Sequence, residues 1–292
     1  LVFTTAMKFS IGLIVLFTVG GLSGVTHSVA PSDTQQTDTY YIVAHFHYVL
    51  FGGAVLGIFS GFYYWWPKMF GKMLNEKLGN WNFWLMVIGM NLTFGPMHIL
   101  GLQGQPRRMY QWTEARAGEG FFNLAFWNLV ASIGSFVLAV GILLFLINVV
   151  ITARNPTKSP LDPWNARSLE WMTSNPPKEH NFDVIPTVHH LDEFFHRKYE
   201  EDPATHTMRQ IATAEEIMAE QERNADKHIH MPSPSYWPII LAGSVPIITF
   251  GMIFSHLIAA IGGVILLFAA FGWALEPSTA PESDFENNSS QG

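Results

Sequence analysis

Long segments without any Asp, Glu, Lys or Arg constrain this fold more than any other feature. Five of them lie between charged residues, and they cover 9–32, 39–67, 78–106, 120–153 and 228–275. A helix needs roughly 20 apolar residues to cross about 30 Å of hydrocarbon, so each of the first four segments holds one span. The fifth is long enough for two, with a break at Ser255-His256 and a kink at Pro246. The sequence therefore predicts an all-α, polytopic transmembrane bundle of about six spans.

Composition agrees with a membrane protein and excludes several classes of function. Only 13% of the residues are charged, whereas soluble domains have about 25%. The absence of Cys excludes disulfide frameworks, thiolate zinc sites and cysteine nucleophiles. The net charge of -7 argues against a nucleic-acid partner. The chain opens at Leu1 inside an apolar segment without a basic n-region, so we interpret it as part of a longer chain rather than as a signal peptide.

The predicted organisation has four parts. Residues 1–154 hold four transmembrane helices, and residues 236–275 form a transmembrane helical hairpin. Between them, 155–235 is a polar cytoplasmic segment with eight Lys/Arg and fourteen Asp/Glu, and 276–292 is a disordered acidic tail. The early part of the polar segment is rich in Pro and is expected to be irregular, while Thr207 to Lys227 is expected to form a solvated helix on the membrane surface.

The basic residues of the short loops set the orientation. Lys68, Lys72 and Lys77 lie between spans two and three, which places that loop in the cytoplasm. Alternation then puts the loop between spans three and four outside, although it carries the basic residues Arg107, Arg108 and Arg116. That violation of the positive-inside rule requires a local reason.

Two histidines stand at the centre of the second span. Ionisable residues inside a membrane helix are costly and are usually functional. Because a helix turns about 100° per residue, His45 and His47 point to nearly opposite sides and are poorly placed to share one metal. Each is suited to bind a separate centre, with Phe46 beside both, and imidazole is a common axial ligand of haem iron. The alternative is a pair of core histidines bonded to neighbouring helices.

Four further residues in or near spans two and three are candidates for the same site. Arg107 and Arg108 are suited to neutralise haem propionates, because the guanidinium group donates paired hydrogen bonds to carboxylates. Asp38 is either the N-cap of the second span or an oxygen ligand for magnesium. His98 is either a ligand or, as we favour, a hydrogen-bonded residue near the haem edge.

These segments resemble a known family. The segment from Asp38 to Val49 (DTYYIVAHFHYV) resembles the most characteristic part of subunit I of the haem-copper terminal oxidases of the cytochrome c oxidase type. Similar family segments are Phe17 to Gly24, Asn91 to His98, and Pro106-Arg107-Arg108. The resemblance extends to about Phe182 and implies that the first four spans are the last four of the family's twelve. Beyond about Ser235 the chain resembles a small two-helix oxidase subunit, here fused.

The resemblance implies specific cofactor roles. His45 would be the proximal ligand of the high-spin haem and His47 an axial ligand of the low-spin haem, with Phe46 between two haems of A type. Arg107 and Arg108 would bind propionates. The family commonly has His before the Asp at position 38, but this chain has Thr37, so a magnesium ligand is missing. The copper ligands belong to earlier helices of the family.

The function implied is the C-terminal part of the catalytic subunit of a proton-pumping cytochrome c oxidase that reduces dioxygen to water. Its partners would be the N-terminal portion of subunit I, subunits II and III, and cytochrome c or an equivalent donor, in the plasma membrane of a bacterium with the tail cytoplasmic. Three alternatives remain: a quinol oxidase of the same superfamily, a membrane electron-transfer cytochrome without oxygen chemistry, and a transporter with intramembrane histidines.

Overall fold

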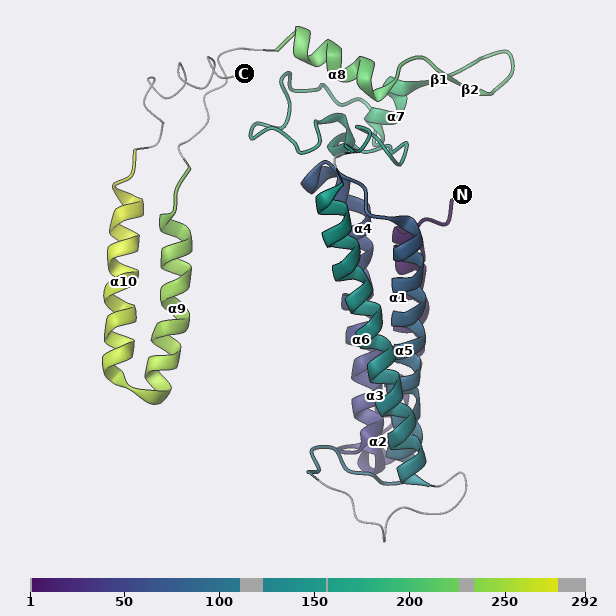
Figure 1. The fold of residues 1–292 in the computed structure, drawn as a ribbon, viewed down its shortest axis with the longest axis vertical. Helices are drawn as coiled ribbons and strands as arrows, with labels where there is room; N and C mark the ends of the chain where they lie inside the picture. Colours follow the sequence, from purple (N-terminus) through teal and green to yellow (C-terminus); the bar gives the residue numbers. More distant parts are fainter. Residues whose placement is uncertain (1, 111–122, 156, 226–233, 278–292) are drawn as a thin grey trace. The chain divides into compact units, whose positions relative to one another are not determined.

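The computed structural model describes residues 2–110, 123–155, 157–225 and 234–277, and it is mainly helical within them (Figure 1). In chain order the elements are α1 (Thr5–His27), α2 (Ala30–Gln36), α3 (Tyr40–Val49), the π-helix η1 (Leu50–Val55), α4 (Leu56–Phe70), α5 (Glu76–Leu102), α6 (Leu124–Arg154), the 3-10 helix η4 (Leu169–Met172), α7 (Glu193–Lys198), β1 (Tyr199–Glu201), β2 (Met208–Gln210), α8 (Ala214–Arg223), α9 (Trp237–Phe254) and α10 (His256–Ala274).

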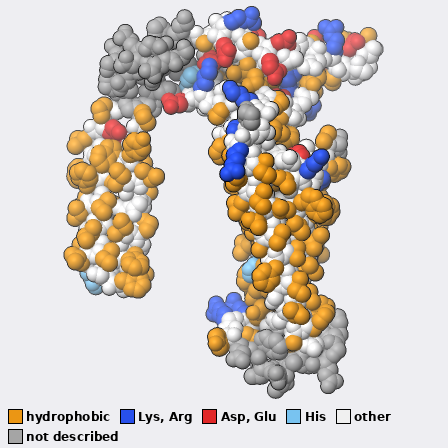
Figure 2. All heavy atoms as spheres, in the orientation of Figure 1, with side chains coloured by type: hydrophobic (Ala, Val, Ile, Leu, Met, Phe, Trp, Pro, Cys, Tyr) orange, Lys and Arg blue, Asp and Glu red, His pale blue; other side chains and the backbone are white. Residues whose placement is uncertain are grey.

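Within the described ranges, six helical segments are long and apolar enough to cross a membrane: α1, the continuous run from α3 through η1 to α4, α5, α6, α9 and α10. The predicted all-α bundle of about six spans is thereby confirmed. Hydrophobic side chains cover the visible sides of these helices, as expected for surfaces that face lipid (Figure 2). Arg116 and the tail from residue 278 lie outside the described residues. The external position of Arg116 and the disorder of the tail therefore stay predictions.

Close backbone contacts hold the first four spans together in one bundle (Figure 1). At Gly89 of α5, an added Cβ would lie 2.5 Å from the backbone nitrogen of Leu138 on α6. At Gly134 of α6, it would lie 2.5 Å from the backbone of Leu92 on α5. Small residues at such crossings let membrane helices gain packing energy that lipid cannot supply. Each of these two positions therefore requires glycine for the close packing of α5 against α6.

Buried polar side chains also tie the bundle together. Asn82 of α5 donates from Nδ2 to the carbonyl oxygen of Gly141 on α6 at 2.8 Å, and it accepts a hydrogen bond of 3.3 Å from the Tyr63 hydroxyl. Asn148 of α6 donates to the carbonyl oxygen of Asn75 at 3.0 Å. Hydrocarbon offers no water, so polar groups at membrane depth must find partners inside the protein. These contacts fix α4, α5 and α6 relative to one another.

The second span contains a π-helical turn, η1, directly after the histidine pair. Here Gly52 packs so tightly against α1 that an added Cβ would lie 2.9 Å from the Cβ of Leu16. The hydrophobic pattern predicted one uninterrupted span and gave no sign of the wider turn. Such turns are inserted singly into α-helices, frequently at functional sites.

The polar segment is anchored to the end of α4. The Lys68 ammonium is buried and donates to the carbonyl oxygen of Thr173 at 2.9 Å and to its hydroxyl at 3.1 Å. The Trp164 indole donates to the carbonyl oxygen of Tyr64 at 2.9 Å, and the Trp171 indole donates to the Tyr64 hydroxyl at 3.0 Å. This part of the segment is irregular yet closely packed against the bundle.

The helix expected over Thr207 to Lys227 is shorter than predicted. Met208–Gln210 pairs with Tyr199–Glu201 in an antiparallel two-stranded sheet, and α8 starts only at Ala214. The reason is a capping box, in which the Thr213 hydroxyl accepts from the Glu216 backbone N–H at 3.2 Å while the Glu216 carboxylate accepts from the Thr213 N–H at 2.7 Å. That reciprocal pair starts the helix at a defined position.

The contacts divide the chain into two compact units, Leu1–Pro177 with Val188–Ala219, and Lys178–Thr187 with Glu220–Gly292. In the second unit, α9 and α10 form a tight hairpin. An added Cβ at Gly251 would lie 2.1 Å from the Ala259 nitrogen. The helix α9 continues through Pro246.

Candidate functional site

The histidine pair lies in the last turns of α3, whose start is fixed by Thr39. The Thr39 hydroxyl accepts a hydrogen bond from the Tyr41 backbone N–H at 3.2 Å and so caps the helix. The alternative that Asp38 is the N-cap is therefore wrong. From this start, helical geometry sends His45 and His47 to different sides of α3.

His45 points toward α1. Its Nδ1 lies 2.9 Å from the carbonyl oxygen of Gly20 and 3.0 Å from the Ser23 hydroxyl. An added Cβ at Gly24 would lie only 2.7 Å from the His45 Cε1, so only glycine leaves room for the ring. With Nδ1 held in this way, Nε2 is the ring nitrogen left for a ligand, and it has no hydrogen-bond partner among the described residues.

His47 points toward α5 instead. Its Nδ1 lies 2.7 Å from the carbonyl oxygen of Val43, one turn earlier on α3. Its ring stacks on Phe94 of α5, with ring centroids 4.1 Å apart and an interplanar angle of 13°. Phe46 lies against the same ring, at a centroid distance of 4.5 Å. Here too Nε2 has no partner within the described part of the chain.

This donor chemistry fits haem iron. Histidines that bind metals usually donate their other ring N–H to a carbonyl or carboxylate group, which fixes the tautomer and the direction of the ring. Both imidazoles have their Nδ1 beside a backbone carbonyl oxygen, so each has the second-sphere contact of an axial ligand. The two rings face different neighbouring helices, so the chain's own residues fit two separate iron centres.

His98 lies on α5, on the side that faces α3. Its Nδ1 is 3.3 Å from the carbonyl oxygen of Gly95, and its ring packs edge-on against Tyr41 and Tyr48 at centroid distances of 5.0 and 5.5 Å. These contacts resemble those of a packed, hydrogen-bonded residue. Its place near a haem edge stays a prediction.

The loop after α5 joins the start of α3. Thr39 and Pro106 form an isolated β-bridge, and the Arg107 backbone N–H donates to the carbonyl oxygen of Asp38 at 2.8 Å. The Arg107 Nε donates to the Asp38 carboxylate at 2.7 Å. The adjacent Arg108 is exposed, and no described residue pairs with its guanidinium group. Of the two arginines, Arg108 is therefore the one available for a further anion.

The pairing of Asp38 with Arg107 weakens the case for magnesium. The described residues contain no group of three or more His, Cys, Asp or Glu side chains that could hold a metal ion. The Asp38 carboxylate is one oxygen donor, and it is already bound to a guanidinium group. A magnesium site there would require other ligands and a different position of Arg107, and the role of Asp38 in binding magnesium stays a prediction.

Sequence reasoning missed the residues on α1 that surround His45. Gly20, Ser23, Gly24 and His27 are spaced at three, four and seven residues, so they share one face of the helix. That spacing, with small residues preceding a histidine, was the sequence pattern that could have indicated a helix face built around another side chain. It became interpretable only once α1 and α3 were known to be neighbours.

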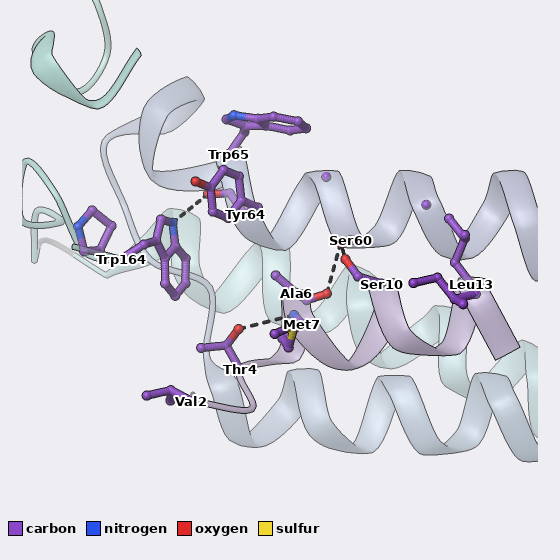
Figure 3. Close-up of a pocket in the computed structure, with 14 residues that line it drawn as sticks. Val2, Thr4, Ala6, Met7, Ser10, Leu13, Ser60, Tyr64, Trp65 and Trp164 are labelled. Atoms are coloured by element: carbon purple, nitrogen blue, oxygen red, sulfur yellow. Dashed lines mark hydrogen bonds between the residues drawn. The ribbon is translucent and has the colours of Figure 1, made fainter. Parts of the chain in front are cut away.

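A separate cavity of about 880 Å³ lies between α1 and α4 (Figure 3). Its walls include Trp65 and Trp164, and its polar groups pair with one another, as in the 2.7 Å contact between Ser10 Oγ and Ser60 Oγ. It lies at the opposite end of α1 from His27. We therefore place the candidate site around the histidine pair and not in this cavity.

The fold and this site define a class: a polytopic membrane protein with paired imidazoles suited to iron on one transmembrane helix. Comparison with known families agrees, since residues 1–137 match the family described as Cytochrome C and Quinol oxidase polypeptide I. Residues 1–137 are therefore a domain of that family. Residues 207–283 match the family described as Cytochrome c oxidase subunit IV, which confirms the predicted fusion with a small-subunit-like tail.

Similar proteins come from both branches of this family. The chain is 39% identical over 275 residues to cytochrome c oxidase subunit 1 of Alkalihalophilus pseudofirmus, a match that covers 91% of this chain and 41% of the relative. It is 38% identical over 266 residues to quinol oxidase subunit 1 of Bacillus spizizenii, covering 90% and 38%. A third relative, cytochrome c oxidase subunit 1 of Thermostichus vulcanus, is 48% identical over 184 residues, covering 63% and 32%. The chain therefore spans about two fifths or less of these relatives' lengths.

Proposed function

We propose that this chain is the C-terminal part of the catalytic subunit of a proton-pumping haem-copper oxidase that reduces dioxygen to water in a bacterial plasma membrane. The observation that carries the proposal is the pair His45 and His47. Each has Nδ1 against a carbonyl oxygen and Nε2 without a described partner, and they face different helices. The two haems, taken to be of A type, would supply electron transfer and dioxygen binding when bound.

The chain's own residues would orient and shield these groups. His45, braced by α1, would hold the high-spin haem, and His47, stacked on Phe94, would hold the low-spin haem. Phe46 would lie between the two. Arg107 and Arg108 would compensate propionate charge, with Arg107 shared with Asp38, and His98 would pack at the haem edge. The role of Asp38 in binding magnesium stays a prediction that this pairing disfavours.

The rest of the site belongs to other parts of the complex. Copper would be bound by residues of the N-terminal portion of subunit I, and subunits II and III would complete the assembly. The polar segment and the tail would face the cytoplasm, consistent with Lys68, Lys72 and Lys77 at that end. We keep cytochrome c as the proposed donor and quinol as the alternative. The two kinds of relative are 39% and 38% identical to this chain, so the choice between donors depends on a partner subunit.

Difference spectra of the complete, purified oxidase test the proposal. We expect His45→Ala to abolish carbon monoxide binding and His47→Ala to abolish the low-spin haem spectrum, because each variant removes one axial nitrogen. His256→Ala is the matched control, since this histidine also lies at a membrane helix but is exposed in the second unit. Unchanged spectra in both site variants would refute the haem assignment, and a complex that never binds carbon monoxide would favour the electron-transfer cytochrome.

A further inference from the structure

His27, at the C-terminal end of α1, is a partly buried histidine to which the proposed function gives no role. Its side chain is only 15% exposed. Both ring nitrogens are shielded from solvent, and neither has a hydrogen-bond partner among the described residues. A buried polar group without a partner is unfavourable, so the folded complex should provide one.

Among the described residues, Asp33 of α2 is the candidate hydrogen-bond partner of His27, but its position does not allow the bond. Its carboxylate oxygen lies 3.6 Å from Nδ1 of His27, beyond the length of a hydrogen bond. The Asp33 side chain is also 48% exposed, so water can solvate it without the histidine. The hydrogen-bond partner of His27 must therefore be another group that lies next to its ring in the complete complex.

That space adjoins the proposed ligand of the high-spin haem. The His27 ring lies 5.0 Å from the His45 ring, centroid to centroid, at an interplanar angle of 63°. It also packs edge-on against Tyr41, with ring centroids 5.4 Å apart. His27 thus continues the face of α1 from which Gly20 and Ser23 orient His45.

We infer that His27 is a positioning residue for the high-spin haem and donates a ring N–H to a carboxylate side group of that haem. The inference rests on the proposed function, because it requires that His45 binds iron. It gives a partner to one of the two ring nitrogens that have none among the described residues, and it explains why a histidine lies at this place in an apolar span. An anionic, peripheral haem group is the chemistry that a buried imidazole N–H next to an axial ligand would recognise.

The midpoint potential of the carbon monoxide-reactive haem gives a direct test. A hydrogen bond to the carboxylate withdraws negative charge from the haem, and its loss favours the ferric form. We therefore expect His27→Leu to lower the midpoint potential and His27→Gln, which keeps a side-chain N–H donor, to restore at least half of the shift. Val25→Ala, on the exposed face of the same turn, is the matched control and should leave the potential unchanged.

Two results would overturn the inference. One is a midpoint potential in both His27 variants equal to that of the unmodified oxidase. The other is an equal shift in Asp33→Asn, which would identify Asp33 as the partner. If His27→Leu fails to assemble, His27→Gln decides alone. Its resonance Raman propionate band should then stay at the unmodified position, and a displaced band would overturn the inference. His45→Ala, measured in parallel, separates the two hypotheses: if it retains carbon monoxide binding, the haem assignment itself fails.

Discussion

Replacing Gly24 by Ala should displace the ring of His45, the proposed high-spin haem ligand, without changing the chemistry of that ligand. The new Cβ would lie 2.7 Å from the Cε1 of His45, which is about 0.7 Å short of the 3.4 Å at which ordinary contact begins. The ring cannot move freely, because its Nδ1 is held by Gly20 and Ser23 at 2.9 and 3.0 Å. Relief of the clash must therefore lengthen those contacts or shift α1 from α3.

The size of the effect follows from this crowding. Overpacking of this kind typically destabilises by about 1–3 kcal/mol. If that energy falls on the imidazole–iron bond, the ligand is weakened roughly 5- to 150-fold. We expect the carbon monoxide difference signal, normalised to low-spin haem, to fall in the purified oxidase. The iron–histidine stretching band in the resonance Raman spectrum should move with it.

Gly21→Ala is the control, because an added Cβ there meets nothing within 4 Å. Both substitutions replace Gly by Ala in the same helix, so they share a gain in helix propensity of about 1 kcal/mol. Only the contact with His45 differs. A normal carbon monoxide signal in Gly24→Ala, or an equal loss in both variants, would show that the position of the ring does not depend on this contact.

Two further predictions concern the polar parts of the chain. Lys68→Met should release the polar segment from α4, because it removes the charged donor to Thr173 and with it about 1.5–3 kcal/mol of stabilisation. Limited proteolysis should then cut the segment faster. An unchanged cleavage rate would contradict the anchoring role. Burial alone would raise the pKa of Asp183, but hydrogen bonds from His180 and Lys178 lower that pKa below its ordinary value. A lowered pKa in the folded state means that the stabilisation is present at neutral pH and is lost as the pH falls below about 4. Hydrogen exchange of residues 178–183, normalised to intrinsic rates, should accelerate in that range, whereas Asp183→Asn should show the same protection on both sides of it.

Much of the bundle could be predicted because hydrophobic length and helical periodicity are local properties. The charge-free segments gave six spans, and the 100° turn per residue was enough to separate His45 from His47. The break at Ser255 is also local, since the structure places the end of α9 there. These features depend on the order of residues along one helix and not on its neighbours.

The details at the helix ends could not be predicted in this way. Asp38 adopts a φ of 59°, in the left-handed region, which turns its carboxylate toward Arg107 and leaves the capping role to Thr39. That choice depends on the loop after α5, whose backbone pairs with the start of α3. Spacing alone cannot reveal a contact between residues 69 positions apart.

The two proposed haem ligands differ in what holds them. The partner of His47 is the carbonyl oxygen of Val43, which belongs to the same helix, so the direction of this ring is set as soon as α3 forms. The partners of His45 are on α1, so its direction depends on the packing of two helices. That packing is close at Gly20, where an added Cβ would lie 2.9 Å from Tyr48. The proposed high-spin site is therefore the part of this chain in which bundle packing and cofactor geometry are most closely linked.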